Sequence, residues 1–318
     1  MVEDDSGATA GAEPVIRCRG VSKRFGARLA VDGLDLDVPQ GLCFGLLGPN
    51  GAGKTTTLKM IYGVVAPTRG EIRVFGLDVT KQPRRVRARL GVTLQENALI
   101  EPLTPVENLR VFARYHLLSE AEITARVERL LDFLELRSHA TLPVRALSGG
   151  FQRRLAIALS LVNDPELLIL DEPTTGLDPA VRLSLWARVR ELRTAGKTVL
   201  LTTHYMDEAQ RLCDRLAILA EGRVVAEGAP AALIRELLAP EALELEASPE
   251  REREILARVN GVAHLRAGTR LMLYAADAAA LLDAIRRDDD DISGVVVRPT
   301  NLEDVFLALT GTHLEGGA

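Results

Sequence analysis

The chain has few cysteines, no long apolar run and no excess of basic charge, and each absence excludes a class of protein. Its three cysteines, Cys18, Cys43 and Cys213, lie far apart without C-x-x-C spacing, so we expect buried, reduced thiols in a reducing compartment rather than a disulfide framework or a metal site. No apolar run reaches the roughly 20 residues that a membrane-spanning helix needs. The net charge is −5 with both signs interleaved, which argues against binding to nucleic acid through phosphate contacts.

The composition otherwise favours a globular chain. An apolar content of 47% over 318 residues is enough for a packed core, and the length favours two domains. The first 14 residues are small and acidic. We expect residues 1–14 to be a disordered leader, neither a signal peptide nor a transit peptide.

The most informative segment is GPNGAGKTT, which matches the P-loop pattern G-x-x-x-x-G-K-[ST]. The apolar run at 42–47 predicts a strand before it and the pattern at 57–65 predicts a helix after it, the setting that this motif requires. Its glycines let backbone N–H groups point at phosphate, a lysine supplies a mobile charge, and a threonine hydroxyl can reach Mg²⁺. We therefore expect a nucleoside triphosphate to bind at Gly48, Pro49, Asn50, Gly51, Ala52, Gly53, Lys54, Thr55 and Thr56.

A second segment, LLILDE, ends a predicted buried strand with two carboxylates. Phosphoryl transfer needs one acid to hold Mg²⁺ and another to activate water. Asp171, on the strand, suits the metal, and Glu172, one residue further, suits the general base. Alone, such a run is a weak signal; after a P-loop it favours a catalytic pair.

A third segment, LSGG, precedes an amphipathic helix. Ser148, Gly149 and Gly150 expose a hydroxyl and free N–H groups at a helix start, which is a second anion-binding end. Because the chain has one P-loop, a second phosphate-binding end indicates a role across a dimer.

Six motifs together resemble the ATP-binding-cassette (ABC) transporter ATPases over roughly residues 15–238. In order they are the P-loop, Gln95 in VTLQEN, LSGGF, LLILDEP, Asp178 in GLD and His204 in LTTHYMDEA. The resemblance implies an α/β P-loop NTPase cassette with a RecA-like core, an antiparallel β subdomain and a helical subdomain at about 97–165. It also implies an ATPase that uses ATP and Mg²⁺.

The resemblance further implies a role for each matching residue. Gln95 should touch the Mg²⁺ ion or the attacking water and relay the nucleotide state to a membrane partner. His204 should contact the γ-phosphate and hold Glu172 and the water in place. The LSGG residues should cap the γ-phosphate bound to the opposite protomer, and Asp178 should link the two sites of a homodimer.

On the nucleoside side, the resemblance implies that Phe25 stacks on adenine and that Val31 lies near the ribose. Phe25 replaces the family's usual tyrosine but keeps an aromatic face, so we expect little loss of stacking. A larger departure is Phe151, which stands where the signature motif has glutamine, with Gln152 displaced by one position. We expect nucleotide binding to survive, while the geometry of dimer closure is put in doubt.

From about residue 239 the pattern changes to β-α-β-β-α-β followed by a helix at 302–309, which suggests a small ferredoxin-like α+β domain over 239–318. The simplest interpretation of the final segment is an amphipathic helix that packs on its own small domain. The strings THYMDEA and PTNLEDVF resemble the daunorubicin-resistance and nodulation-factor exporter ATPases. That resemblance implies export of a drug, lipid or oligosaccharide by a separate membrane permease, which docks near Gln95 and the helical subdomain at the cytoplasmic membrane face.

Three alternatives remain open at this point. An ABC importer subunit is the nearest, because the cassette motifs are the same. A soluble ABC ATPase of DNA repair, chromosome or ribosome work is disfavoured by the single cassette and the lack of sustained heptads. An unrelated P-loop kinase or GTPase does not explain LSGGF together with His204.

Overall fold

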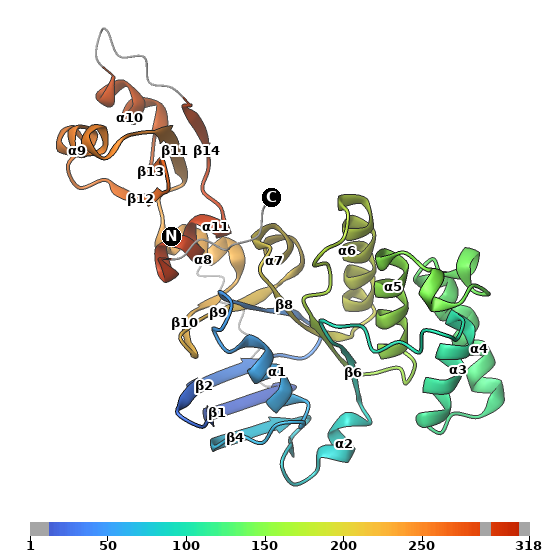
Figure 1. Cartoon of the computed structure of the whole chain (residues 1–318). Helices are drawn as coiled ribbons and strands as arrows, with labels where there is room; N and C mark the ends of the chain where they lie inside the picture. Colours follow the sequence, from blue (N-terminus) through green and yellow to red (C-terminus); the bar gives the residue numbers. More distant parts are fainter. Residues whose placement is uncertain (1–12, 287–293, 312–318) are drawn as a thin grey trace, which may run out of the picture.

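The computed structural model describes residues 13–286 and 294–311, so nearly all of the expected leader lies outside the described residues. The described chain contains three sheets (Figure 1). The first two belong to the part that carries the P-loop, and the third forms a separate small domain joined to it beyond residue 238.

The core is a six-stranded sheet in the order β10-β9-β3-β8-β7-β6. All neighbours are parallel except β10, which pairs antiparallel with β9. The carboxyl ends of parallel strands meet at one edge, where ligands bind in open α/β sheets. The strands are β3 Cys43–Leu47, β6 Leu90–Thr93, β7 Leu167–Asp171, β8 Thr198–Thr203, β9 Arg215–Ala220 and β10 Arg223–Gly228.

The β subdomain is a four-stranded antiparallel sheet in the order β2-β1-β4-β5. Its apolar face shares one core with the P-loop helix α1 and with β3, through side chains such as Ile16, Leu58 and Phe44. This packing fixes the β1–β2 hairpin beside the P-loop. The elements are β1 Ile16–Phe25, β2 Arg28–Val38, α1 Lys54–Ile61, β4 Arg69–Val74, β5 Leu77–Asp78 and α2 Pro83–Arg87.

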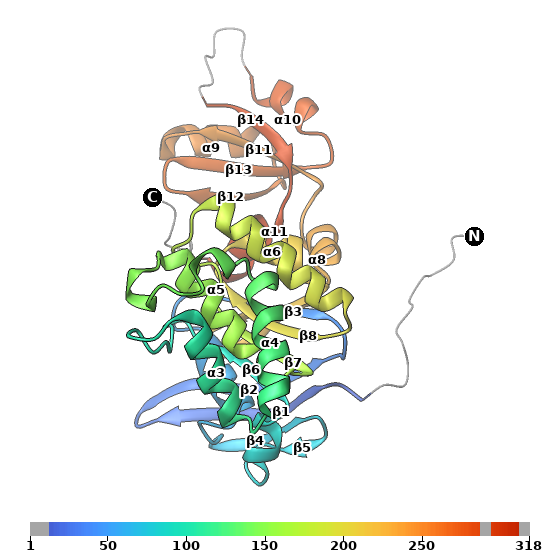
Figure 2. The same ribbon diagram turned by 90° about the vertical axis from the view of Figure 1, so that its right-hand side faces the viewer.

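The helical subdomain lies in front of the core sheet in Figure 2. Two of its helices begin with capping boxes: Thr104 accepts from the Glu107 N–H and Ser119 accepts from the Glu122 N–H, while each glutamate side chain bonds back to the cap. Two single-turn 3₁₀ helices at Arg137–His139 and Val144–Ala146 lead into the LSGG segment. The helices are α3 Pro105–Tyr115, α4 Glu120–Phe133 and α5 Gly149–Ser160, with α6 Pro179–Thr194 following β7.

The small domain has the predicted β-α-β-β-α-β order. Its antiparallel sheet runs β12-β13-β11-β14, so the first and third strands are central, and α9 and α10 cover one face. The elements are β11 Glu241–Glu246, α9 Pro249–Arg258, β12 Ala263–Ala267, β13 Arg270–Ala275, α10 Ala278–Ile285 and β14 Val296–Pro299. Before it lie α7 Met206–Leu212 and α8 Pro230–Leu237.

The last helix, α11 Leu302–Thr310, does not pack only on its own small domain, so that interpretation is wrong. Leu302, Val305 and Phe306 belong to the large apolar core that includes α7 and α8, whereas Leu307 belongs to a small cluster on the free face of the small sheet. The helix is buried on both sides because it presents apolar residues to two partners. None of the helices in the described ranges is long and apolar enough to cross a membrane.

Candidate nucleotide-binding site

A cavity of about 550 Å³ lies at the carboxyl edge of the core sheet, between the P-loop and the β1–β2 hairpin. The residues that line it come from the hairpin, the P-loop, α1, the segment after β6 and the end of β7. They are Phe25, Arg28, Ala30, Asn50, Gly51, Gly53, Lys54, Thr55, Thr56, Lys59, Val65, Gln95 and Glu172. The fold therefore brings together motifs that are far apart in the sequence.

The P-loop forms a backbone cradle that only glycine can complete. Gly48 and Gly53 have φ of 156° and 103°, and a Cβ at these positions would lie 2.4 Å from the Leu219 carbonyl oxygen and 2.6 Å from that of Ala30. Below the cradle the Lys54 ammonium is 6% exposed and donates to the Gly48 and Pro49 carbonyls at 2.6 and 3.2 Å. Burial lowers the pKa of Lys54, although the nearby carboxylates of Glu172 and Asp171 oppose that shift. Lysine and glycine donors around an open cavity fit a triphosphate.

Glu172 lies directly after β7, in a left-handed conformation with φ 47°, which is uncommon for a residue other than glycine. Its backbone N–H donates to the Thr202 hydroxyl at 3.0 Å, and this bond holds the turn. Its Oε2 accepts from Gln95 Nε2 at 3.1 Å and from the Thr175 hydroxyl at 3.2 Å, and lies 3.5 Å from His204 Nδ1. The bond from His204 is the largest cause that lowers the pKa of Glu172. The carboxylate is thus held ionised and oriented at the cavity.

Asp171 is 4% exposed at the end of β7 and accepts from the Thr202 hydroxyl at 2.6 Å. Gln95 and Thr55 line the cavity, whereas Asp171 does not. Within the described chain, no cluster of three or more His, Cys, Asp or Glu could hold a metal ion by itself. One carboxylate, a hydroxyl and an amide could hold Mg²⁺ together with phosphate oxygens and water, because Mg²⁺ is usually bound by few protein oxygens.

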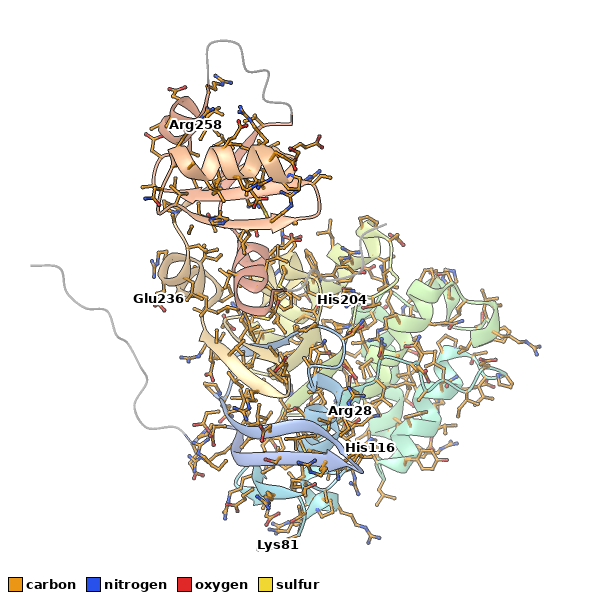
Figure 3. All side chains as sticks on the ribbon, turned by 60° about the vertical axis from the view of Figure 1, so that its left-hand side comes forward. Arg28, Lys81, His116, His204, Glu236 and Arg258 are labelled. Atoms are coloured by element: carbon orange, nitrogen blue, oxygen red, sulfur yellow. The ribbon has the colours of Figure 1, made fainter. Side chains whose placement is uncertain are left out.

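His204 lies directly after β8 (Figure 3). Its side chain is 17% exposed. The ring lies 4.3 Å from the ring of Tyr205, which limits its rotation. It does not line the cavity, and it reaches the site through its contact with Glu172.

Phe25, at the end of β1, is 49% exposed and faces the cavity, with the Lys23 ammonium 4.9 Å from its ring centroid. Val31, which the resemblance places near the ribose, does not line the cavity. Its side chain is completely buried below the P-loop, where a Cβ on Gly53 would lie 3.3 Å from its Cγ2. Ala30, one residue earlier on β2, lines the cavity instead.

The LSGG residues and Asp178 do not line this cavity. Ser148 is exposed and is the N-cap of α5, with its hydroxyl accepting from the Phe151 N–H at 3.5 Å. Around Gly149 nothing lies within 4 Å of where a Cβ would be. Asp178 caps α6 by accepting from the Val181 N–H at 3.0 Å. These residues are therefore open for contact outside their own protomer's cavity.

Phe151 has a packing role that the sequence did not indicate. Its ring lies 3.8 Å from the ring of His139, centroid to centroid. The adjacent Gln152 turns back and donates to the Val144 and Leu147 carbonyls at 3.3 and 3.2 Å. The displaced glutamine thus braces the turn that presents Ser148.

Sequence reasoning missed several residues that support the site. Thr202, Thr175 and the buried Arg153 contact the segment around Glu172 directly. Glu208 is fully buried on α7 and accepts from the Thr174 hydroxyl at 2.8 Å and from the Trp186 indole at 2.7 Å. Strand β6, which leads into Gln95, was not predicted either. Thr202 carried a usable signal, because a polar residue inside an apolar strand needs a partner.

Comparisons with known proteins agree with this geometry. Residues 31–175 match the family model described as "ABC transporter", and residues 249–311 match the C-terminal domain of the nodulation factor export protein NodI. Two Nod factor export ATP-binding proteins I are each 45% identical to the chain. The protein of Cupriavidus metallidurans aligns over 94% of this chain and 98% of its own length. The protein of Rhizobium johnstonii aligns over 93% of this chain and 94% of its own length.

Solved structures give the same assignment for the cassette. An ATP-binding subunit of an ABC transporter is 33% identical, with a TM-score of 0.64 over 70% of this chain and 92% of its own. The cassette MJ0796, solved as a dimer with ADP and phosphate, is 28% identical, with a TM-score of 0.62 over 67% and 98%. The chain is thus similar over nearly its whole length to the Nod factor export ATP-binding proteins, and it belongs to the ABC transporter family as the ATP-hydrolysing subunit of an ABC exporter.

Proposed function

We propose that two copies of this chain form a head-to-tail dimer on a separate membrane permease, and that hydrolysis at Glu172 resets the dimer after each transport step. The observation that carries this proposal is the Glu172 carboxylate. It is held beside the P-loop by Gln95 and Thr175, with His204 at 3.5 Å.

In this proposal the Glu172 carboxylate takes the proton from the attacking water. Because its pKa is lowered, it is in the ionised form that a general base requires near neutral pH. Lys54 neutralises phosphate charge from below the P-loop, and Phe25 stacks on the base. Thr55, Asp171 and Gln95 would hold Mg²⁺, which when bound offsets the negative charge that grows on the phosphate oxygens.

The dimer follows from where the LSGG residues lie. Ser148, Gly149 and Gly150 form an exposed helix N-terminus, which is an anion-binding end without an anion partner in its own protomer's cavity. In the dimer we place this end on the γ-phosphate bound to the opposite P-loop, with Asp178 between the two sites. ATP then joins the two copies, and loss of the γ-phosphate lets them separate.

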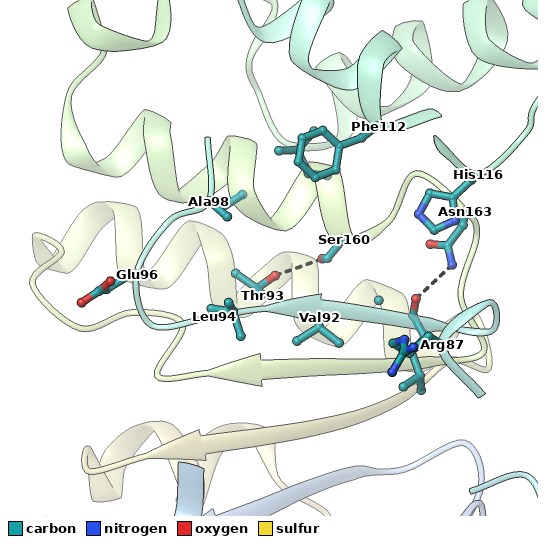
Figure 4. Close-up of a pocket in the computed structure, with 14 residues that line it drawn as sticks. Arg87, Val92, Thr93, Leu94, Glu96, Ala98, Phe112, His116, Ser160 and Asn163 are labelled. Atoms are coloured by element: carbon teal, nitrogen blue, oxygen red, sulfur yellow. Dashed lines mark hydrogen bonds between the residues drawn. The ribbon is translucent and has the colours of Figure 1, made fainter. Parts of the chain in front are cut away.

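We place the permease contact at a groove beside Gln95. A cavity of about 300 Å³ runs between β6, α3 and α5 and is lined mainly by apolar atoms (Figure 4). Phe112 and His116 form one wall, and Thr93 donates to Ser160 at 3.0 Å on its floor. Burial lowers the pKa of His116, so the groove gains no charge from it near neutral pH. An amphipathic helix of the permease fits such a groove, and its movement would reach Gln95 through β6.

The cargo we propose is of drug, lipid or oligosaccharide type, and Nod factor export is the activity for which the similar proteins are named. The cargo contacts lie in the permease in this proposal. The chain would then be a peripheral protein at the cytoplasmic face of the membrane.

The test uses tagged Glu172→Gln protein, which keeps the nucleotide cradle but cannot accept the proton. We expect steady-state hydrolysis to fall by about 100-fold or more, with ATP binding retained. Recovered with Mg-ATP from detergent-solubilised native membranes, it should carry a stoichiometric polytopic membrane protein, identified by mass spectrometry.

Glu166→Gln is the matched control, because Glu166 pairs with Arg89 at the far end of β7. It should hydrolyse ATP at the normal rate. Wild-type hydrolysis by Glu172→Gln would remove the catalytic-base assignment. Recovery of ribosomes or DNA-repair proteins without a membrane protein would contradict the transport role.

A further inference from the structure

Arg153, on the helix that follows the LSGG segment, holds two loops of the nucleotide site at once. Its guanidinium is only 4% exposed and makes six hydrogen bonds to oxygen atoms of those loops. To the loop at 94–97, Nη1 donates to Leu94 O at 2.5 Å, to Gln95 O at 3.3 Å and to Asn97 Oδ1 at 3.1 Å. To the turn at 171–173, Nη2 donates to Asp171 O at 2.7 Å and to Glu172 O at 2.9 Å, and Nε donates to Pro173 O at 2.9 Å.

These bonds join three segments that are separate in the sequence. One is the loop at 94–97 that carries Gln95, the second is the turn at 171–173 that carries Glu172, and the third is α5 itself. The Gln95 side chain donates to the Glu172 carboxylate at 3.1 Å, so the two residues whose backbones Arg153 grips also touch each other. The Arg153 guanidinium therefore helps to set the position of the amide relative to the carboxylate, together with Thr202 and Thr175.

The chemistry of the site requires arginine. The buried cation is costly, and its burial lowers the pKa of Arg153 to about 10, which leaves it charged near neutral pH. Five N–H donors in a rigid plane can serve several carbonyls on two sides, whereas a lysine has three donors on one flexible point. Replacement by lysine would keep the charge and lose the fixed fork.

We propose that Arg153 is a positioning residue for hydrolysis, which sets the Gln95 loop against the Glu172 turn and ties both to the signature helix. The inference rests on the roles proposed above for Gln95 and Glu172. The helix α5 carries Gly149 and Gly150 at its start and Arg153 one turn later. If the helical subdomain shifts on dimer closure, α5 moves the Arg153 guanidinium and with it both loops. In the proposed dimer, Ser148 of one chain contacts the nucleotide on the partner's P-loop. That contact is thereby coupled to Gln95 and Glu172 of the same chain, which act on the nucleotide at its own P-loop.

The test compares Arg153→Lys with the wild-type protein. We expect kcat to fall by about tenfold or more, because misplacement of reacting groups by an ångström is enough for such losses. The Kd for Mg-ATP should change by less than about twofold, because Arg153 contacts neither the P-loop nor Phe25. Hydrogen exchange should increase at residues 94–99 and 172–176 and stay unchanged in β3 and α1.

Arg188→Lys is the matched control, because Arg188 is a partly buried arginine on α6 whose partners are Glu135 and Glu191. It should leave kcat and exchange unchanged. Asn97→Ala is a milder second variant that removes one acceptor from an exposed residue and should fold normally. We expect it to lower kcat by about threefold.

If Arg153→Lys and Asn97→Ala both keep wild-type kcat, the proposal is overturned. It is equally overturned if Arg153→Lys loses ATP affinity in parallel with kcat, because the effect would then be a general loss of structure. Glu172→Gln separates this result from the proposed function, since its hydrolysis tests the base whether or not Arg153 positions it.

Discussion

At the scale of single residues, the site is built from buried polar groups whose partners lie on other elements. Glu208, which is fully buried on α7, is an example. Its Oε1 accepts from the Thr174 hydroxyl and from the Trp186 indole, and burial raises its pKa. The catalytic candidates Glu172, His204 and Gln95 could be predicted from the sequence, because each lies in a recognisable string. Arg153 and Glu208 could not, because their partners are backbone and side-chain atoms 18 to 59 positions away, which no local pattern records.

The raised pKa of Glu208 makes a pH-dependent prediction. The folded protein keeps the Glu208 proton at pH values where the unfolded chain has released it. Glu208 therefore contributes most to the free energy of unfolding below its unfolded pKa of about 4.3, and this contribution is lost as the pH rises from there through its pKa in the folded protein. Each tenfold difference in proton affinity is worth about 1.4 kcal/mol, which corresponds to a few degrees in the melting temperature.

Glu208→Gln removes the titration and keeps an oxygen acceptor. We therefore expect the melting temperature of the variant minus that of the wild type to be higher at pH 8 than at pH 5, as measured by scanning calorimetry. Asp207→Asn, at the exposed neighbouring position, is the control and should give the same difference at both pH values. An equal offset for Glu208→Gln at both pH values would show that the pKa of Glu208 is not raised.

At the scale of elements, sequence patterns predicted the long or capped segments well. Both capping boxes of the helical subdomain and the Asp178-Pro179 start of α6 were readable, because each is a local hydrogen bond. Strand β6 was missed since it has only four residues, and α11 was assigned to the wrong partner. An amphipathic pattern says that a helix buries a face, but it does not say against which part of the molecule.

The two-sided burial of α11 can be tested with two substitutions in adjacent residues. Phe306 faces the ATPase core and Leu307 faces the small sheet. The chain has one tryptophan, Trp186 on α6, so thermal unfolding followed by tryptophan fluorescence reports on the ATPase part.

Phe306→Ala should destabilise that transition by about 3–5 kcal/mol. Leu307→Ala should leave the fluorescence midpoint nearly unchanged while lowering the stability of the small domain. If the fluorescence midpoint responded to Leu307→Ala and not to Phe306→Ala, the placement of α11 would be wrong.

At the scale of the whole molecule, the proposed dimer would have two composite sites, and each chain would contribute half of each. The P-loop cavity contains no LSGG residue of its own chain, so we expect a complete site only where two copies meet. The order of motifs in the sequence predicts this dimer only through the resemblance. It was not sufficient to predict how the small domain attaches, because that depends on tertiary packing of residues 302–307.

Mixing two inactive variants tests the composite site. Lys54→Ala removes the phosphate-binding lysine, and Ser148→Arg blocks the signature end. A mixed dimer has one site with both defects and one site with neither, so mixing equal amounts should restore hydrolysis, up to about a quarter of the wild-type rate if the sites act independently. Each variant alone should stay inactive. No recovery on mixing, with dimers confirmed by native mass spectrometry, would contradict the composite site.

The position of α11 also has a consequence for the order in which the chain folds during synthesis. Met206 and Ala209 of α7 and Leu233 of α8 share their apolar core with the last helix, whose residues leave the ribosome about 70 positions after α8. Until then, the surface that α11 covers is open to water or to a chaperone. Synthesis at about 5–20 residues per second makes this interval several seconds long. The ATPase part therefore completes its core only after the small domain has been made.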